Sequence, residues 1–138
     1  FAQTFSDAVY QLEENPMGIS RLKFHFWGDM GEISYHNAQG EKTIRFGFGH
    51  NVFQQFPQEG YSDLIATVPE PGHTYRCAAS AAWTEPQKLH VKVQIIDKYF
   101  GILDMVFSFR DNLLSLTMVK TAEAFLDEYQ GSANGKRV

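Results

Sequence analysis

Four apolar segments in a row, between Tyr75 and Met118, constrain the fold of this chain more than any other feature. Side chains of a β-strand alternate between two faces, so apolar residues at every second position mark a strand with one buried face. The four sets are Tyr75, Cys77, Ala79, Ala81 and Trp83; Leu89, Val91, Val93 and Ile95; Leu103, Met105, Phe107 and Phe109; and Leu114, Leu116 and Met118. This pattern predicts four consecutive antiparallel strands.

The turns between these segments also predict how the strands pair. Asp111-Asn112 tolerates positive φ and suits a two-residue hairpin turn, and counting outward from each turn gives a register. The predicted pairs are Phe109 with Leu114, Phe107 with Leu116, Met105 with Met118, Trp83 with Leu89, Val93 with Met105, and Val91 with Phe107. A slip of one residue would turn a whole apolar set outward, so the agreement among pairs supports one continuous sheet.

Shorter alternating segments precede this block. Strands are expected over residues 8–14, 22–27, 33–35, 44–48 and 64–68. A four-residue loop, Gly28 to Gly31, would place Phe26 opposite Ile33, and the following turn would place Ile33 opposite Ile44. About eight to ten short strands, joined mostly by tight turns, predict an all-β, antiparallel up-and-down barrel.

The last part of the chain shows a different period. Phe125, Leu126 and Tyr129 lie at helical spacing. Thr121 is a suitable N-cap, so we expect a short C-terminal helix over residues 122–130, ended by Gly131. With 138 residues the chain suits one domain, predicted over residues 1–131 and followed by a flexible tail at 132–138.

The inside of such a barrel is open to two interpretations. A barrel of about eight strands is either filled by side chains or wide enough for one small ligand. The small inward residues Ala79 and Ala81 leave room for a ligand or for a large neighbouring side chain. Aromatic residues expected inside serve core packing in the simpler interpretation. In the other they line a ligand site, whose residues would be Tyr35, Phe46, Phe48, Tyr75 and Trp83.

Composition and charge exclude several classes of protein. A net charge of −4 and a pI near 5.7 argue against broad nucleic-acid binding, which needs a basic face. No apolar run approaches the roughly 20 residues of a membrane span. The single Cys77 cannot form an internal disulfide and is expected to be a small buried residue. A single unpaired cysteine and the lack of a visible leader segment slightly favour a cytoplasmic location.

One serine motif is present, but it predicts no active site. Ser20-Arg21-Leu22-Lys23 matches the S-x-x-K pattern of penicillin-recognising serine enzymes, in which the serine opens a helix. Here the residues after Ser20 alternate as in a strand, which turns Ser20 and Lys23 to opposite faces. The five histidines, at positions 25, 36, 50, 73 and 90, lack the spacing of a zinc site. We therefore expect no catalytic residue, metal or cofactor.

Several segments resemble a known family. The strings RFGFGHNVFQQFP, YRCAASAAW, KVQIIDKYFG and KTAEAFLDEYQG are similar to the C-terminal region of bacterial β-lactamase-related, penicillin-binding-protein-like serine hydrolases. In that family a catalytic N-terminal domain is followed by a lipocalin-like β-barrel. The resemblance covers residues 10–131. It implies that this chain is the barrel and that the hydrolytic serine lies in an upstream domain missing here, in agreement with the non-initiator Phe1.

Three functions follow from these observations. The first is a non-catalytic accessory domain that docks on the catalytic domain of the same polypeptide and shapes substrate access. Exposed Trp27, Phe53 and Phe56 would then belong to the domain interface. The alternative is a stand-alone barrel that binds a small hydrophobic ligand, which an internal cavity would favour and a side-chain-filled barrel would oppose. The third, a peptide added at a sheet edge, needs an unpaired strand.

Overall fold

The computed structural model describes residues 2–60, 73–97, 100–122 and 125–138. The segment predicted as a strand at 64–68 lies outside these residues. A short helix, α1 (Ala2–Phe5), comes first. The strands are β1 (Val9–Leu12), β2 (Arg21–Trp27), β3 (Met30–Asn37), β4 (Gly40–Phe48), β5 (Val52–Gln55), β6 (Arg76–Glu85), β7 (Lys88–Ile96), β8 (Phe100–Arg110), β9 (Leu113–Thr121) and β10 (Gly131–Arg137).

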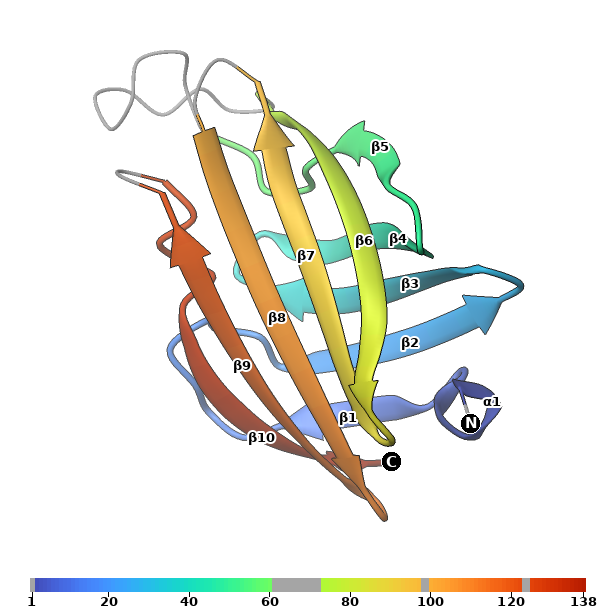
Figure 1. Ribbon diagram of the computed structural model, residues 1–138. Helices are drawn as coiled ribbons and strands as arrows, with labels where there is room; N and C mark the ends of the chain where they lie inside the picture. The colour runs from blue at the N-terminus through green and yellow to red at the C-terminus, as the bar shows by residue number, and fades with distance from the viewer. Residues whose placement is uncertain (1, 61–72, 98–99, 123–124) are drawn as a thin grey trace.

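The strands of the described residues form one sheet that closes into a barrel (Figure 1). Their order is β4-β3-β2-β1-β10-β9-β8-β7-β6-β5. A short parallel contact between β4 and β6 closes 9 of these described strands into a ring and leaves β5 beside β6 as an extra strand. In Figure 1 the long strands β6 to β9 cross in front of β1 to β4. The predicted all-β, lipocalin-like up-and-down barrel is therefore confirmed.

Strand pairing confirms much of the predicted register. The confirmed pairs are Phe109–Leu114, Phe107–Leu116 and Met105–Met118 between β8 and β9, Trp83–Leu89 between β6 and β7, and Ile33–Ile44 between β3 and β4. Between β8 and β9 the chain turns at Asp111-Asn112, as predicted, so counting from the turn gave the correct partners. Between β6 and β7 the register shifts between Trp83 and Glu85, and Trp83 lies opposite Leu89 on the far side of that irregularity.

Two predicted hairpin registers are wrong by two residues. Val93 lies opposite Leu103 instead of Met105, and Phe24 instead of Phe26 lies opposite Ile33. In the second case the loop between paired Trp27 and Met30 has two residues rather than four. A shift of two keeps every side chain on its predicted face, so the apolar pattern could not reveal either error.

The predicted C-terminal helix is also wrong. The described residues of segment 122–130 form turns and bends. The amide of Tyr129 donates to the carbonyl of Leu126 at 3.0 Å and closes a single turn, and Leu126 has a φ of 65°, which no right-handed helix continues through. Phe125, Leu126 and Tyr129 are nevertheless buried, so their spacing marks a segment that covers the core.

Residues 132–137 of the predicted flexible tail instead belong to strand β10, which lies between β9 and β1. Its sequence, GSANGKR, has no β-branched or aromatic residue and therefore shows little intrinsic strand preference. Backbone pairing with β9 on one side and β1 on the other makes this segment a strand despite its weak intrinsic preference. Gly135 is suited to this position, because a Cβ there would lie 2.4 Å from Leu12 Cδ2 and 2.9 Å from the Gln11 carbonyl oxygen.

The apolar faces of the strands meet inside the barrel. Alternation is clearest in β8, where every second residue from Gly101 to Phe109 is buried. Cys77 is fully buried, as predicted, and lies on the inner face of β6. Large side chains from β1, β2, β3, β4, β8 and β9 form one connected core with it. This interior is the place where a ligand site was predicted.

Candidate functional site

The residues predicted to line a ligand site all belong to the barrel interior. They are Tyr35, Phe46 and Tyr75, which are buried, and Phe48 and Trp83, which are partly buried against the core. Phe46, Phe48 and Trp83 gather around Phe26, whose ring centroid lies 6.3, 6.2 and 5.9 Å from theirs. Tyr35 and Tyr75 contact different neighbours, so the predicted set is divided between two parts of the interior.

The first part is an aromatic cluster made from α1 and the five strands β1, β2, β4, β6 and β8. Its members, linked by ring contacts, are Phe5, Tyr10, Phe24, Phe26, Phe46, Phe48, Trp83, Phe107 and Phe109. Phe24 meets Phe107 edge-on at 5.0 Å and Phe109 edge-on at 5.2 Å. Phe5 stacks on Phe109 at 4.2 Å, so the helix covers this part of the interior. Such geometry is the preferred one for aromatic pairs.

The second part is a polar cluster of four side chains, Tyr35, Asn37, Gln58 and Tyr129. The hydroxyl groups of Tyr35 and Tyr129 lie 2.7 Å apart. Tyr129 donates to Gln58 Oε1 at 2.8 Å, and Asn37 Nδ2 donates to the same oxygen at 3.0 Å. Asn37 ends β3, and Phe26 and Phe46 of the aromatic cluster lie opposite Gly31, near the other end of that strand. Tyr10 of the aromatic cluster lies in the same cross-strand row as Tyr35, so the two clusters are neighbours inside the barrel.

Both parts of the interior are uncharged at neutral pH. Burial raises the pKa of Tyr129 well above the ordinary tyrosine range, and the hydrogen bond from Tyr35 offsets only part of this effect. Burial likewise raises the pKa of the Cys77 thiol to about 12, so it remains a thiol and a poor nucleophile. The interior can thus offer apolar surface and neutral hydrogen-bonding groups.

Two glutamine side chains join the segment after β4 to the rest of the barrel. Gln54 Nε2 donates to the carbonyl of Arg45 at 2.6 Å, and the amide of Arg45 donates to Gln54 Oε1 at 3.0 Å. Gln39 makes the same two-point contact with Glu59, at 2.9 Å in both directions. Each side-chain amide thereby donates to a backbone carbonyl and accepts from a backbone N–H, as a neighbouring strand would. The gap between β4 and β5 is bridged in this way, so that edge is not the freely available one that peptide addition needs.

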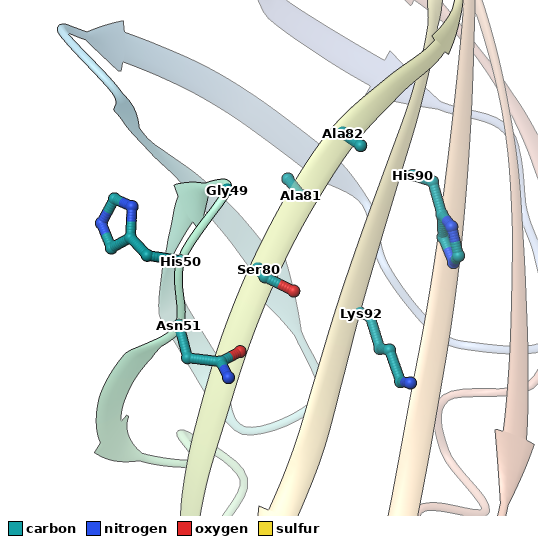
Figure 2. Close-up of a pocket in the computed structure, with 8 residues that line it drawn as sticks. All are labelled: Gly49, His50, Asn51, Ser80, Ala81, Ala82, His90 and Lys92. Carbon is teal, nitrogen blue, oxygen red and sulfur yellow. The ribbon is translucent and has the colours of Figure 1, made fainter.

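A shallow cavity of about 390 Å³ lies on the outer face, next to the β4–β6 contact (Figure 2). Asn51, Ser80, His90 and Lys92 contribute polar groups to its lining. His90 Nε2 lies 2.9 Å from Asp104 Oδ1, and His50 extends away from β6 in Figure 2. Among the described residues, no group of three or more His, Cys, Asp or Glu side chains could hold a metal.

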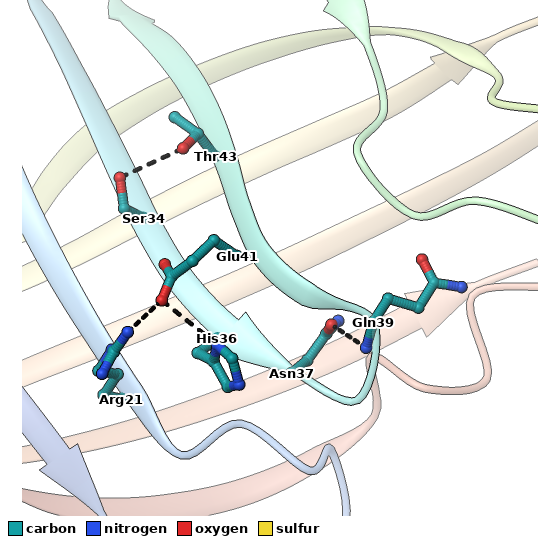
Figure 3. A network of polar contacts seen from close by, with 7 residues as sticks. All are labelled: Arg21, Ser34, His36, Asn37, Gln39, Glu41 and Thr43. Carbon is teal, nitrogen blue, oxygen red and sulfur yellow. Dashed lines mark hydrogen bonds and ion pairs between the residues drawn. The ribbon is translucent and has the colours of Figure 1, made fainter. Parts of the chain in front are cut away.

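A second outer network joins β2, β3 and β4 (Figure 3). The carboxylate of Glu41 accepts a hydrogen bond from Arg21 and lies 3.2 Å from His36 Nδ1. The hydrogen bond from Arg21 is the main cause that lowers the pKa of Glu41. Because all three side chains are largely exposed, this network is an ordinary solvated strand face.

The serine motif is split by the fold. Ser20 lies just before β2, while Lys23 is inside that strand with its Nζ 3.7 Å from an Asp7 carboxylate oxygen.

Among the described residues, no helix has the length and apolar character required to cross a membrane.

Several residues of the interior were not predicted as site residues. Phe24, Phe107 and Phe109 follow the alternation that marked the strands, so the sequence carried a signal for them. Gln58 lies in the least regular segment of the chain, and no pattern could have placed it beside Tyr129, 71 positions away. The polar cluster is therefore a feature that only the structure shows.

Comparison with known proteins returns structures but no sequence relatives: no family model and no curated protein matches the chain. A fatty acid-binding protein from brain tissue of Drosophila melanogaster has a TM-score of 0.59 and 12% identity over 97% of this chain and 99% of its own. A fatty-acid-binding protein from Manduca sexta has a TM-score of 0.56 and 11% identity over 97% and 99%. A variant of the REP1-NXSQ fatty acid transporter has a TM-score of 0.56 and 11% identity over 100% of both chains.

These structures overturn the resemblance to bacterial serine hydrolases. The similar proteins are matched over nearly their full length, so this fold occurs in them without a catalytic domain. The strings that carried the resemblance lie mostly on strands and turns, whose alternation many barrels share. The accessory-domain hypothesis, with its missing catalytic domain as partner, loses its support.

The residues assigned to the supposed domain interface do not form a common surface. Phe56 is fully buried and contacts the ring of Tyr129 at 5.3 Å. Trp27 and Phe53 are exposed by 39% and 69% and lie on β2 and β5. Along nearly its whole length, the chain has the fold of the fatty-acid-binding proteins.

Proposed function

We propose that this barrel stands alone and binds a small hydrophobic ligand in its interior. The observation that supports this proposal is the likeness, over nearly the whole chain, to barrels named for fatty acid binding. The apolar, uncharged interior agrees with it, because such surroundings favour ligands with a large apolar area. The ligand would contact Phe46, Phe48 and Trp83 in the aromatic cluster, and Tyr35 and Tyr75 toward the polar cluster.

This function is non-enzymatic. Binding needs apolar surface and a few polar groups for orientation, and it needs no nucleophile or charged acid–base pair. The inward thiol of Cys77 is kept protonated by burial, as described above. The predicted partner is therefore a small hydrophobic molecule, and the net charge of −4 makes nucleic acid an unsuitable one.

Thermal unfolding with a panel of hydrophobic molecules tests the proposal. A ligand that binds only the folded state raises the unfolding midpoint by mass action. The chain has 2 tryptophans, so Trp27→Phe leaves Trp83 as the only one, and binding inside the barrel should change its fluorescence. Binding at the outer surface would raise the midpoint without this change. If no ligand raises the midpoint, the interior is a side-chain core and the proposed function is wrong.

A further inference from the structure

Tyr10 has a buried hydroxyl group that forms no hydrogen bond with the part of the chain that the structure describes. Its side chain is 0% exposed, and its ring contacts the inward-facing rings of Phe24 and Phe109 at 6.5 and 6.0 Å. No described residue donates a hydrogen bond to the Tyr10 hydroxyl or accepts one from it. In contrast, the hydroxyl of Tyr129, also buried, has partners at 2.7 and 2.8 Å.

A buried polar group without a partner is unfavourable, and its presence in a native structure needs an explanation. A phenylalanine would fill the same volume beside Phe24 and Phe109 without this cost. Burial raises the pKa of Tyr10, and the charge of nearby Arg137 opposes this effect only in part. The group therefore remains a neutral hydroxyl, which can donate one hydrogen bond and accept others.

The charges around the interior decide which ligand atom suits this hydroxyl. Apart from tyrosines, the buried polar side chains of the described residues are Asn37 and Gln58, both neutral. Lys42 and Lys120 occupy inward positions near strand ends. Lys42 lies opposite Tyr35 and is partly exposed. Lys120 forms an ion pair with Asp127. Arg137 is exposed and donates to the carbonyl of Thr4. A carboxylate beside Tyr10 would thus be a buried anion without a buried cation, which is strongly unfavourable.

We propose that the Tyr10 hydroxyl is the internal anchor for an uncharged ligand, and that it binds a neutral oxygen, such as an alcohol or carbonyl oxygen, at the buried end of an apolar chain. This inference rests on the proposed function and narrows it to a ligand class. The aromatic rings of Phe24 and Phe109 would flank the apolar carbons next to that oxygen. A ligand without an oxygen would leave the hydroxyl unpaired. An anionic one would lose its hydration with only the exposed Arg137, the cross-strand partner of Tyr10, as a nearby cation.

Dye displacement with three molecules of equal chain length tests the inference: a long-chain alcohol, the corresponding alkane and the corresponding carboxylate. In the wild type we expect the alcohol to bind about five- to tenfold more tightly than the alkane, the effect of one hydrogen bond. The carboxylate should bind more weakly than the alcohol. Tyr10→Phe should reduce alcohol affinity to that of the alkane and leave alkane affinity unchanged.

The ligand-free variants give an independent measurement. Tyr10→Phe removes an unpaired hydroxyl and should raise the unfolding midpoint, whereas Tyr129→Phe removes a paired one and should lower it. If Tyr10→Phe does not fold, a wild-type tyrosine Cζ NMR signal that shifts with the alcohol but not with the alkane replaces the affinity comparison.

The outcomes separate this inference from the proposed function. Carboxylate binding equal to or tighter than alcohol binding, or unchanged alcohol affinity in Tyr10→Phe, would overturn the inference and leave the binding function standing. Failure of every ligand to bind would overturn both.

Discussion

The aromatic cluster and the polar cluster of the interior stabilise the barrel in different ways. The aromatic cluster is joined by ring contacts between 4.2 and 6.5 Å, with no hydrogen bond among its side chains. The polar cluster depends on four hydrogen bonds of 2.7, 2.8, 3.0 and 3.5 Å that share the oxygens of Tyr129 and Gln58. Packing in the aromatic cluster is non-directional, whereas the polar cluster needs every hydrogen-bonding partner to be present.

This difference determines how each part responds to change. Apolar packing loses stability in proportion to the volume and area that a substitution removes. A buried hydrogen-bonded group loses more than its own bond, because its former partner is left unsatisfied. The Tyr10 hydroxyl is the exception inside the aromatic cluster, and it is therefore the place where a polar ligand atom would be most useful.

The largest expected effect is in the aromatic cluster. Phe24→Ala removes a fully buried ring from contacts with Phe107 and Phe109, and should lower the free energy of unfolding by about 3–5 kcal/mol in chemical denaturation. Phe53→Ala is the matched control on an exposed ring and should change it by less than about 0.5 kcal/mol. Similar losses in both variants would contradict the description of this cluster as the core.

An intermediate effect is expected in the polar cluster. Tyr129→Phe leaves Gln58 Oε1 and the Tyr35 hydroxyl each with one partner fewer and should cost about 1–3 kcal/mol. Tyr35→Phe made in the same background should cost less than it does alone, since its partner has already gone. Denaturation of the two single variants and the double variant measures this coupling. Strict additivity would show that the two hydroxyls are not joined.

A smaller, local effect is expected where Gln39 holds the segment that carries Gln58. Gln39→Leu removes two hydrogen bonds to Glu59, each worth about 0.5–1.5 kcal/mol. Amide hydrogen exchange should become faster at Glu59 but stay unchanged in β8, beside the aromatic cluster. Gln94→Leu, on the exposed face of β7, provides the control. Faster exchange in β8 would mean that the two clusters are coupled.

The smallest effect is expected on the outer surface near the polar cluster. The hydrogen bond from Arg21 lowers the pKa of Glu41 in the folded state, so its stabilisation is present above the unfolded-state pKa and is lost as pH falls through the folded-state pKa. Unfolding at a series of acidic pH values should show this loss, and Arg21→Gln should make it smaller. An unchanged pH profile in Arg21→Gln would show that Glu41 is not the source of the stability loss at acidic pH.

The sequence predicted which side chains face inward better than it predicted where strands lie opposite one another. Alternation placed Phe24, Val93 and Phe107 on the correct face, because that property depends only on neighbouring positions. The β2–β3 and β7–β8 registers depended on loop length, and an error of two residues leaves the faces unchanged. Strand β10 could not be predicted at all, since its pairing partners, not its own residues, make it a strand.

The candidate site was predictable only in part. Apolar lining such as Phe46 and Trp83 follows from strand alternation. The polar cluster brings together positions 35, 37, 58 and 129, whose proximity depends on closure of the barrel. The unpaired hydroxyl of Tyr10 is likewise a property of the assembled interior, because a sequence shows the group but not the absence of a partner.

Strand β10 also has a consequence for how the barrel is made. It pairs with β1, and Arg137 reaches the carbonyl of Thr4 across 133 positions of sequence. Such distant pairing slows folding, and during synthesis the ring cannot close before β10 has left the ribosome. Until then β1 and β9 each present an open edge to other nascent chains. The seam that completes the barrel is therefore also where an unfinished chain is most exposed to aggregation.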